Sequence, residues 1–529
     1  MKQYKNRNEV EEKYKWDLSE YYKNDDEFFV SYNKLDKELD ILKDYVGCTK
    51  DSNKLYEYLN KETELEAEVE KNYIYAVVRN DEVLGQSIPL DMLNKANLLM
   101  TKLSNLTAFF NPELLKLSKD KYEKLFSNND KLLIYKPYLD NMYRYKEHIL
   151  TEEEEKIATL IVSATNDFRT ISSNLLNSEH DYGKIEIEDG KRVELTTTNS
   201  RFLKTSRNRK IRKEADTKLL KKASSYATTS ASLLNNYVKL EDALASIYHF
   251  DNSLDAKLFS NELNVKIYDV LSSTVRKHVD SLQRYYNVKK KILCLDELYT
   301  YDLLTKLTTY DKEYSIEEAQ KMIREALKPL GEDYLTKYDK IINNRYIDYC
   351  QYKGKCSGGY SISGHKTNSR ILMSYNYDFE SISTIAHEAG HNINDQYLIE
   401  NNFLPYRENA IINAEVTSLI NECLLANYMI KNGKTKEEKI MGLDSIIGVI
   451  ESNLFGSVRE GDMERLMHEN VHNGNCLTKE FMCKITKDSL KYYYGDKVKL
   501  TKYSPYKWIY RSHYYSKLCY LCISGFLSC

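Results

Sequence analysis

Two histidines and one glutamate between residues 381 and 391 have the types and the spacing that bind a metal ion. His387, Glu388 and His391 form a His-Glu-x-x-His motif. On a helix, positions four residues apart lie on the same face, so both imidazoles can bind one ion. Zinc accepts imidazole nitrogen readily, and such a pair supplies half of a tetrahedral site. Glu388 lies about 100° around the helix from His387, where its carboxylate can accept a proton from a water molecule at the metal.

The residues around the motif favour a helix. Asp378, Ser381 and Ser383 are residue types that cap a helix N-terminus. The small residues Ala389 and Gly390 would allow another element to approach closely. The apolar face of this helix would consist of Ile382, Ile385, Ala386 and Ala389. A pair of surface histidines on an ordinary helix is the alternative explanation, and this context disfavours it.

The third metal ligand has to come from another part of the chain, because a catalytic zinc needs three protein ligands and an open position. Glu415 lies in a helical, mostly apolar segment, where an unpaired carboxylate would be costly to bury. It follows His391 after a loop with Pro405, which leaves room for a helix to return. Glu408 and Glu422 compete with it on spacing alone, and Glu422 could instead be solvated or ion-paired. On chemistry we favour Glu415 and leave the other two open.

A second pair of histidines, His468 and His472, has the same four-residue spacing. No glutamate follows His472 at ligand spacing within an apolar frame. We therefore expect this pair to lie at a solvated helix end and not to bind a metal.

The elements that position the motif are expected to be mainly helices. The 529 residues include only 6 Pro and 18 Gly, well below the usual frequencies. This shortage of turn formers excludes a collagen-like or Pro/Gly-rich disordered chain and argues against a many-stranded β protein. Heptad-like apolar spacing runs from Asp26 to about Glu179, with breaks at 47–53, at Pro112 and at 127–130. Helical patterning then resumes to about Leu293 and again covers 380–494.

Two short blocks have β character. Residues 185–195 alternate between apolar and polar types on both sides of an Asp-Gly pair, which is typical of a hairpin. A second block covers residues 346–377, with β-prone runs at 356–361 and 370–375. We expect a mainly α protein in which a small β-sheet lies beside the helix of the zinc motif.

Charge and hydropathy exclude several partners. The chain has 77 basic and 79 acidic residues, a net charge of −2, and no basic stripe, so we expect no nucleic acid partner. The polar start lacks the apolar core of a signal peptide, and the longest apolar stretch, residues 518–529, is too short to span a bilayer. Ten cysteines are too sparse for a secreted disulfide scaffold. We expect a cytoplasmic protein that binds no membrane.

The stretch from residue 353 to residue 415 resembles the oligoendopeptidase F family, a group of zinc oligopeptidases related to thimet oligopeptidase. The similarity includes residues 371–373, the motif at His387, Pro405-Tyr406 and Ala414-Glu415. It extends over most of the chain and includes residues 16–18, 148–153, 202–212, 301–303, 462–469 and 508–515. Many metallopeptidases share the zinc motif alone, whereas the motif with these flanks is far more specific.

This resemblance implies a zinc-dependent endopeptidase that cleaves short unstructured peptides. It implies two helical lobes around a deep substrate channel, with a helical N-terminal region at residues 1–200 and a catalytic region at residues 201–529. One zinc ion per chain is expected as the cofactor, short peptides are the expected partners, and we expect a monomer.

The resemblance also implies roles for individual residues. It makes Glu415 the third zinc ligand beside His387 and His391, with Glu388 as general base and acid. Donors to the reaction's oxyanion are implied at His513, Tyr514 and Tyr515. The peptide backbone would bind along a sheet edge that includes Gly358, Gly359, Tyr360 and Ser374.

The sequence departs from the family pattern in two places. After Tyr515 the family continues with closely spaced tyrosines and further helical chain, whereas residues 518–529 here are apolar and contain three cysteines. Arg459 and Glu460 occupy positions where the family usually has apolar and amide residues. Both departures bear on catalysis and stability. The alternative to an active enzyme is therefore a catalytically impaired or inactive peptide-binding remnant, caused by a lost C-terminal segment.

Overall fold

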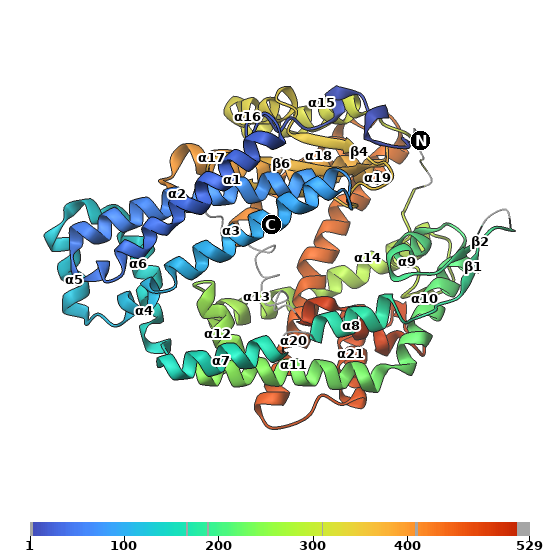
Figure 1. Cartoon of the computed structure of the whole chain (residues 1–529). Helices are drawn as coiled ribbons and strands as arrows, with labels where there is room; N and C mark the ends of the chain where they lie inside the picture. The colour runs from blue at the N-terminus through green and yellow to red at the C-terminus, as the bar shows by residue number, and fades with distance from the viewer. Residues whose placement is uncertain are drawn as a thin grey trace. The chain divides into compact units, whose positions relative to one another are not determined.

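Helices dominate the computed structural model, which describes residues 4–165, 168–187, 190–308, 310, 312–407 and 411–515 (Figure 1). The chain divides into two compact units. The first contains Met1–Ile149 and Asp311–Tyr428; the second contains Leu150–Tyr310 and the described chain from Met429 onward. Each unit therefore combines an early and a late part of the sequence. The prediction of a mainly α protein in two helical parts is confirmed, while the channel and the boundary at residue 200 stay predictions.

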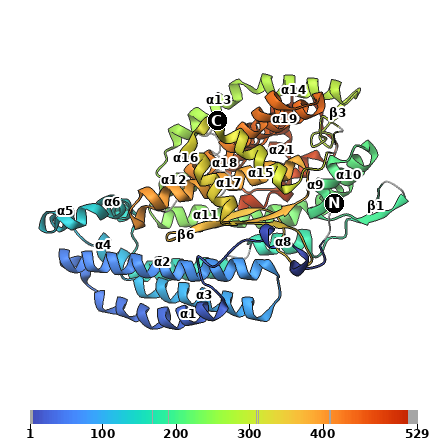
Figure 2. The ribbon, with the colours of Figure 1, turned by 90° about the horizontal axis from the view of Figure 1, so that it is seen from above.

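The first unit begins with helices that pack along one another. In both views α1, α2 and α3 lie side by side (Figure 2). Asp51 caps α2 by accepting hydrogen bonds from the backbone N–H groups of Asn53 and Lys54, both at 2.9 Å, within the break predicted at 47–53. The helix α4 begins at Phe110, two residues before Pro112, where the sequence predicts a break. The bounds are α1 Asp25–Glu38, α2 Ser52–Glu82, α3 Ser87–Thr107, α4 Phe110–Leu115, α5 Lys119–Asn128 and α6 Lys136–Tyr143.

The later part of the first unit contains a three-stranded sheet in the order β4-β6-β5. β4 (Ile347–Cys350) pairs with β6 (Thr367–Tyr375) in parallel, and β5 (Tyr360–Gly364) pairs with β6 antiparallel, so β5 is an edge strand. Ile362 and Leu372 of this sheet pack into one core with Ile74 and Tyr75 of α2. The β block predicted at residues 346–377 is therefore confirmed.

Four helices accompany this sheet: α15 Ile316–Leu327, α16 Glu332–Asn343, α17 Phe379–Asn401 and α18 Ile411–Asn432. α17 packs against β5 and β6, and the buried Asn392 donates from Nδ2 to the backbone oxygen of Ser369 at 2.9 Å. A small sheet thus lies beside the helix of the zinc motif, as predicted.

The second unit is also built mainly from helices. Its hairpin pairs Ile185 of β1 with Val193 of β2, which confirms the hairpin predicted at residues 185–195. The second, short sheet pairs β3 with β7 in parallel. The bounds are α7 Glu152–Thr165, α8 Phe168–Asn177, β1 Lys184–Glu186, β2 Arg192–Glu194, α9 Thr197–Thr205, α10 Arg209–Ser225, α11 Ala227–Ile247, α12 Ser253–Ser260, α13 Val265–Lys277, α14 Val279–Ile292, β3 Leu298–Tyr299, α19 Lys436–Val449, α20 Ser457–His472, α21 Lys479–Tyr494 and β7 Val498–Lys499.

None of the described helices combines the length and the apolar composition that a membrane crossing needs.

Candidate metal centre

The helix that contains the zinc motif starts at a strong cap. Asp378 accepts a hydrogen bond from the backbone N–H of Ser381 at 2.8 Å and so closes the first turn of α17. The predicted apolar face is buried: the exposed fraction is 0% for Ile382, Ile385, Ala386 and Ala389. Because this face is fixed against the rest of the first unit, the histidines of α17 point in a defined direction.

His387, His391 and Glu415 come together with the geometry of a metal site. Their ligand atoms all lie within 4.8 Å of one another. The two Nε2 atoms are 3.1 Å apart, and the Glu415 carboxylate oxygens lie 3.7 Å from His387 Nε2 and 4.0 Å from His391 Nε2. Ligands about 2.0–2.1 Å from a tetrahedral zinc are about 3.3 Å apart. The three residues therefore fit a small divalent cation.

Glu422 contacts the other nitrogen of His387. Its Oε1 lies 2.7 Å from Nδ1, and its Oε2 accepts a hydrogen bond from Ser383 Oγ at 3.2 Å. A carboxylate in this position holds the proton on Nδ1 and leaves the lone pair of Nε2 for a metal. Spacing allowed Glu408, Glu415 and Glu422 as the third ligand. Of these, Glu422 contacts Nδ1 of His387, and Glu408 lies outside the described residues.

The two histidines have opposite pKa shifts. Burial lowers the pKa of His387, but the hydrogen bond and charge of Glu422 outweigh it and raise that pKa overall. Burial and the neighbouring His387 lower the pKa of His391. The neutral form that metal binding requires is therefore favoured at His391.

Glu388 lies beside the three ligand residues without being part of their cluster. It is buried, with 7% of its surface exposed. Burial, with the charges of Glu415 and Glu422, raises its pKa to about 7, while His387 and a backbone hydrogen bond from Ser361 oppose that rise. A carboxyl group with this pKa can both accept and release a proton near neutral pH.

Gly390 allows α18 to approach α17, as its small size predicted. A Cβ atom at this position would lie 2.6 Å from the Cα of Ser418 and 2.7 Å from the backbone oxygen of Thr417. Both atoms belong to the backbone of α18, which also contains Glu415. The glycine in the motif is therefore required by the contact that brings Glu415 close to the two histidines.

Gly390→Ala is expected to destabilise the fold by about 1–3 kcal/mol, because the added methyl group forces α18 away. This loss should appear although alanine favours a helix over glycine. Metal affinity should fall as well, because Glu415 moves with α18. Gly448→Ala is the matched control, since open space surrounds that helical position, and it should be neutral or slightly stabilising. Urea unfolding and a metal titration of both variants test this, and equal stability of the two would contradict it.

The residues predicted to bind the peptide backbone lie at the start of β5 and on β6. The Gly358 N–H donates to Ser374 Oγ at 3.1 Å, and Ser374 donates in turn to Gln351 Oε1 at 2.8 Å. A Cβ atom at Gly359 would lie 2.9 Å from Thr384 Cγ2 of α17. The hydroxyl of Tyr360 donates to Asp81 Oδ2 at 2.7 Å. Their role in binding a substrate stays a prediction.

The three predicted oxyanion donors belong to the second unit, in a 3₁₀ turn at Ser512–Tyr515. His513 is exposed, and burial of its ring with the charges of Arg511 and Arg169 lowers its pKa. Tyr514 and Tyr515 are buried in the core of this unit. Of these three side chains, only His513 presents an exposed polar group to solvent.

Arg459 and Glu460, the residues that depart from the family pattern, form an ion pair with each other. Arg459 Nη2 lies 2.8 Å from Glu460 Oε1, and Arg511 Nη2 lies 3.1 Å from the same oxygen. The hydroxyl of Tyr514 donates to Glu460 Oε2 at 2.7 Å. Although burial raises the pKa of Glu460, these arginines and the tyrosine lower it to about 2. Arg459 and Glu460 thus neutralise each other's charge, and the contacts of Glu460 with Arg511 and Tyr514 hold the turn that contains His513.

Glu460→Gln is expected to cost about 3 kcal/mol of unfolding free energy at pH 7, because it leaves two arginines without their counter-charge. The pKa of Glu460 is lower in the folded chain than in the unfolded chain, so its contribution is complete above about pH 5 and is lost as the pH falls toward 2. The difference between wild type and variant should therefore shrink on acidification. Urea unfolding at pH 7 and pH 3 measures it.

Glu469→Gln is the control for that substitution, because Glu469 pairs with Arg465 on the surface and should contribute less than about 0.5 kcal/mol. A loss at Glu469 as large as at Glu460, or a Glu460 effect that is independent of pH, would contradict the assignment.

The prediction of a solvated helix end for the second histidine pair is wrong for His468. This residue is 5% exposed, and its Nδ1 lies 2.6 Å from Ser253 Oγ. His472 is exposed, and its Nδ1 lies 3.0 Å from Asp242 Oδ1. The spacing could not reveal this difference, because one residue faces the core of the second unit and the other faces solvent.

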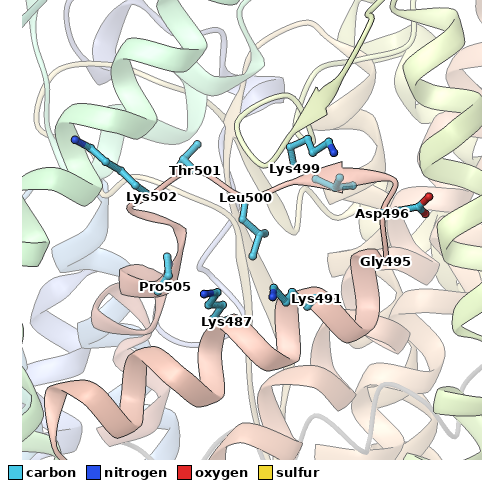
Figure 3. Close-up of a pocket in the computed structure, with 10 residues that line it drawn as sticks. Lys487, Lys491, Gly495, Asp496, Lys499, Leu500, Thr501, Lys502 and Pro505 are labelled. Atoms are coloured by element: carbon cyan, nitrogen blue, oxygen red, sulfur yellow. The ribbon is translucent and has the colours of Figure 1, made fainter.

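A surface pocket of about 370 Å³ lies in the second unit, between the C-terminal half of α21 and the segment around β7 (Figure 3). The residues that line it include Lys487 and Lys491 of α21 together with Lys499 and Lys502. None of the predicted site residues lines it, so its position gives no support to a role in the metal chemistry.

One signal for the arrangement of the site was present in the sequence, and another feature of the site left none. Glu415 and Glu422 are seven residues apart, which places both on one face of α18, two turns apart. This spacing could have indicated one ligand and one partner of a ligand. The approach of the Ser361 backbone to Glu388 had no such signal, since it depends on how β5 packs against α17.

Comparisons with known proteins show the family of this chain. The model of peptidase family M3 matches residues 202–524, and that of the oligopeptidase F N-terminal region matches residues 113–182. An oligoendopeptidase F homolog of Borreliella burgdorferi is 31% identical over 521 residues, covering 97% of this chain and 86% of its own. One from Lactococcus lactis subsp. lactis is 30% identical over 516 residues, covering 97% and 85%.

Solved structures show the same fold. A putative peptidase from Chlamydophila abortus matches with a TM-score of 0.88 at 25% identity, covering 99% of this chain and 88% of its own. The oligoendopeptidase-F of Enterococcus faecium matches with a TM-score of 0.68 at 23% identity, covering 95% and 87%, and this likeness concerns the fold alone. The family model covers more than half of the chain and the curated relatives span nearly all of it, so the chain belongs to peptidase family M3, in its oligoendopeptidase F group.

Proposed function

We propose that this M3 metallopeptidase is a zinc-dependent endopeptidase that hydrolyses short unstructured peptides. The observation that supports this most is the cluster of His387, His391 and Glu415 with the buried Glu388 beside it. Two imidazoles and one carboxylate are a donor set typical of catalytic zinc sites, and three protein ligands leave one position open. When bound, zinc supplies Lewis acidity, which lowers the pKa of water and polarises a peptide carbonyl.

Glu388 would act as the proton carrier of the reaction. Its carboxylate accepts a proton from the attacking water at one Oε atom and later donates that proton to the leaving amine. Its burial excludes bulk water, and its pKa of about 7 lets it hold the proton between the two steps. His387 is oriented for metal binding by Glu422, which holds the Nδ1 proton.

The edge strand β5 is proposed to bind the substrate backbone. An edge strand has unpaired N–H and C=O groups to which an extended peptide can add as a further strand. Gly358, Gly359, Tyr360 and Ser374 would shape the start of this edge. His513 is proposed to assist at the oxyanion; Tyr515 is less suited, because it is buried and its hydroxyl donates to the backbone oxygen of Ser230 at 3.5 Å. Tyr514 is the least suited donor because its hydroxyl is bound to Glu460.

Several broader assignments belong to the same proposal. The ordinary charge balance and the family resemblance support a cytoplasmic monomer whose partners are peptides. The family resemblance also supports a helical N-terminal region to about residue 200, followed by the catalytic region.

The test is cleavage of an internally quenched peptide of about ten residues by the purified, zinc-loaded chain. Turnover that a chelator removes and zinc restores would support the proposal. Zinc binding with a folded chain but no turnover would support the alternative, a peptide-binding remnant impaired by its C-terminal segment. Failure to bind any divalent metal would contradict both.

A further inference from the structure

Arg407 has a charge that no carboxylate of the described chain neutralises. Its Nε donates to the backbone oxygen of Asn402 at 3.0 Å, and its Nη1 donates to that of His365 at 2.8 Å. Both acceptors are neutral. By contrast, Arg79 and Arg345 each pair with an aspartate at 2.9 and 2.8 Å. Half-buried Arg407 has a lowered pKa, caused by burial without any compensating charge.

The charges around Arg407 are already engaged with other groups. Glu70 of α2 accepts a hydrogen bond from the backbone N–H of His365 at 2.6 Å and lies 2.6 Å from His365 Nδ1. Lys366, the next residue in the turn between β5 and β6, pairs with Glu68 at 2.9 Å. This turn therefore has one neutralised cation, Lys366, and beside it lies Arg407, which no carboxylate of the described residues neutralises.

The position of Arg407 is defined relative to Glu388 by the contacts along β5. Glu388 contacts the backbone of Ser361, and Asp395, two turns further along α17, contacts Ser363. Arg407 donates to the backbone oxygen of His365. His365 follows Ser361 by four residues, just past the end of β5 at Gly364, so the two lie at most about 13 Å apart, the length of about four residues of an extended peptide.

We propose that Arg407 forms an anion subsite for the substrate, about four residues from the peptide bond that is cleaved. A guanidinium with free N–H groups at the end of an edge strand would bind a carboxylate that a peptide beside that strand brings to it. That carboxylate is either the C-terminus of the peptide or an aspartate or glutamate side chain. The inference rests on the proposed peptidase function and adds a preference for acidic peptides to it.

The test uses the zinc-loaded full chain and matched quenched decapeptides. One arm compares a C-terminal acid with the amide, and the other compares Glu with Gln at positions three to five residues from the cut. In at least one of the two comparisons, kcat/KM of the acidic peptide should exceed that of the matched neutral peptide by about tenfold, because the acidic peptide has the lower KM. Arg407→Gln should bring this ratio to about one, and Arg407→Lys should give an intermediate ratio.

Lys366→Gln is the matched control, because it removes a cation of the same turn that is already paired; its ratio should equal that of the wild type. Since both peptides meet the same enzyme preparation, the ratio is independent of partial unfolding. A wild-type ratio of about one in both arms, or a ratio that persists in Arg407→Gln, would overturn the inference. Absence of turnover for every peptide would count instead against the peptidase function. The role of Arg407 would then be tested by fluorescence anisotropy, as the ratio of the dissociation constants of the neutral and the acidic peptide.

Discussion

Glu388→Gln is expected to lower kcat for a quenched decapeptide roughly 10²- to 10⁴-fold, the range that general acid–base catalysis contributes. Glutamine has the same shape but can neither take a proton from water nor pass one to the leaving amine. Because Glu388 is not one of the clustered ligand residues, metal affinity should stay within a few-fold of the wild type. Burying an amide in place of a carboxyl group with a raised pKa should not destabilise the fold, which thermal unfolding checks.

Glu400→Gln is the matched control for this substitution. Glu400 lies near the C-terminal end of the same helix, is exposed and pairs with Lys337, so the control should retain full turnover. Equal turnover of Glu388→Gln and wild type would contradict the proposed role of Glu388. Loss of zinc together with turnover would instead make Glu388 a ligand or a structural support of the site.

The helical character of the fold follows from the sequence because helices leave local signals. The pattern around residues 378–391 indicated the cap at Asp378, the buried face and the close approach at Gly390, and the structure confirms all three. Residues 294–345 gave no such clear pattern, yet they contain α15 and α16. Which stretches of the chain make up each of the two units could not be predicted, since each unit joins stretches that are far apart in sequence.

The chemistry of the site was predictable only as far as it is local. His387, Glu388 and His391 are fixed by one helix, so their spacing was sufficient. The environment of His468, by contrast, depends on Ser253, which lies more than two hundred residues away in the sequence. The same holds for Arg407, which has only backbone acceptors among the described residues because of how the chain folds around the turn at His365. Packing between residues far apart in the sequence therefore decides which titratable groups have partners. The spacing of residues along a single sequence does not predict these contacts.

Glu415→Gln and Glu422→Gln are expected to weaken zinc binding to different extents, and the order distinguishes a ligand from its support. Structural zinc sites bind with about 10–16 kcal/mol from four ligands, so one lost ligand corresponds to about 3–4 kcal/mol, or roughly 10²–10³-fold in affinity. The Glu415 carboxylate faces both Nε2 atoms, so Glu415→Gln should fall in this range. Glu422 contacts only Nδ1 of His387, and removing such a partner costs about 10–100-fold.

Competition with a chromophoric chelator at fixed pH measures these affinities, with Glu400→Gln as the control of unchanged affinity. Glu408→Gln completes the series, because spacing alone also allowed Glu408 as the third ligand. If Glu415 is the ligand, Glu408→Gln binds zinc as the wild type does; if Glu408 is the ligand, its variant loses zinc and Glu415→Gln does not. A larger loss in Glu422→Gln than in Glu415→Gln would exchange the two roles. It would mean that His387 binds zinc through Nδ1, next to Glu422, and not through Nε2, next to Glu415. The order of the affinities therefore tests which nitrogen of His387 and which glutamate bind the metal.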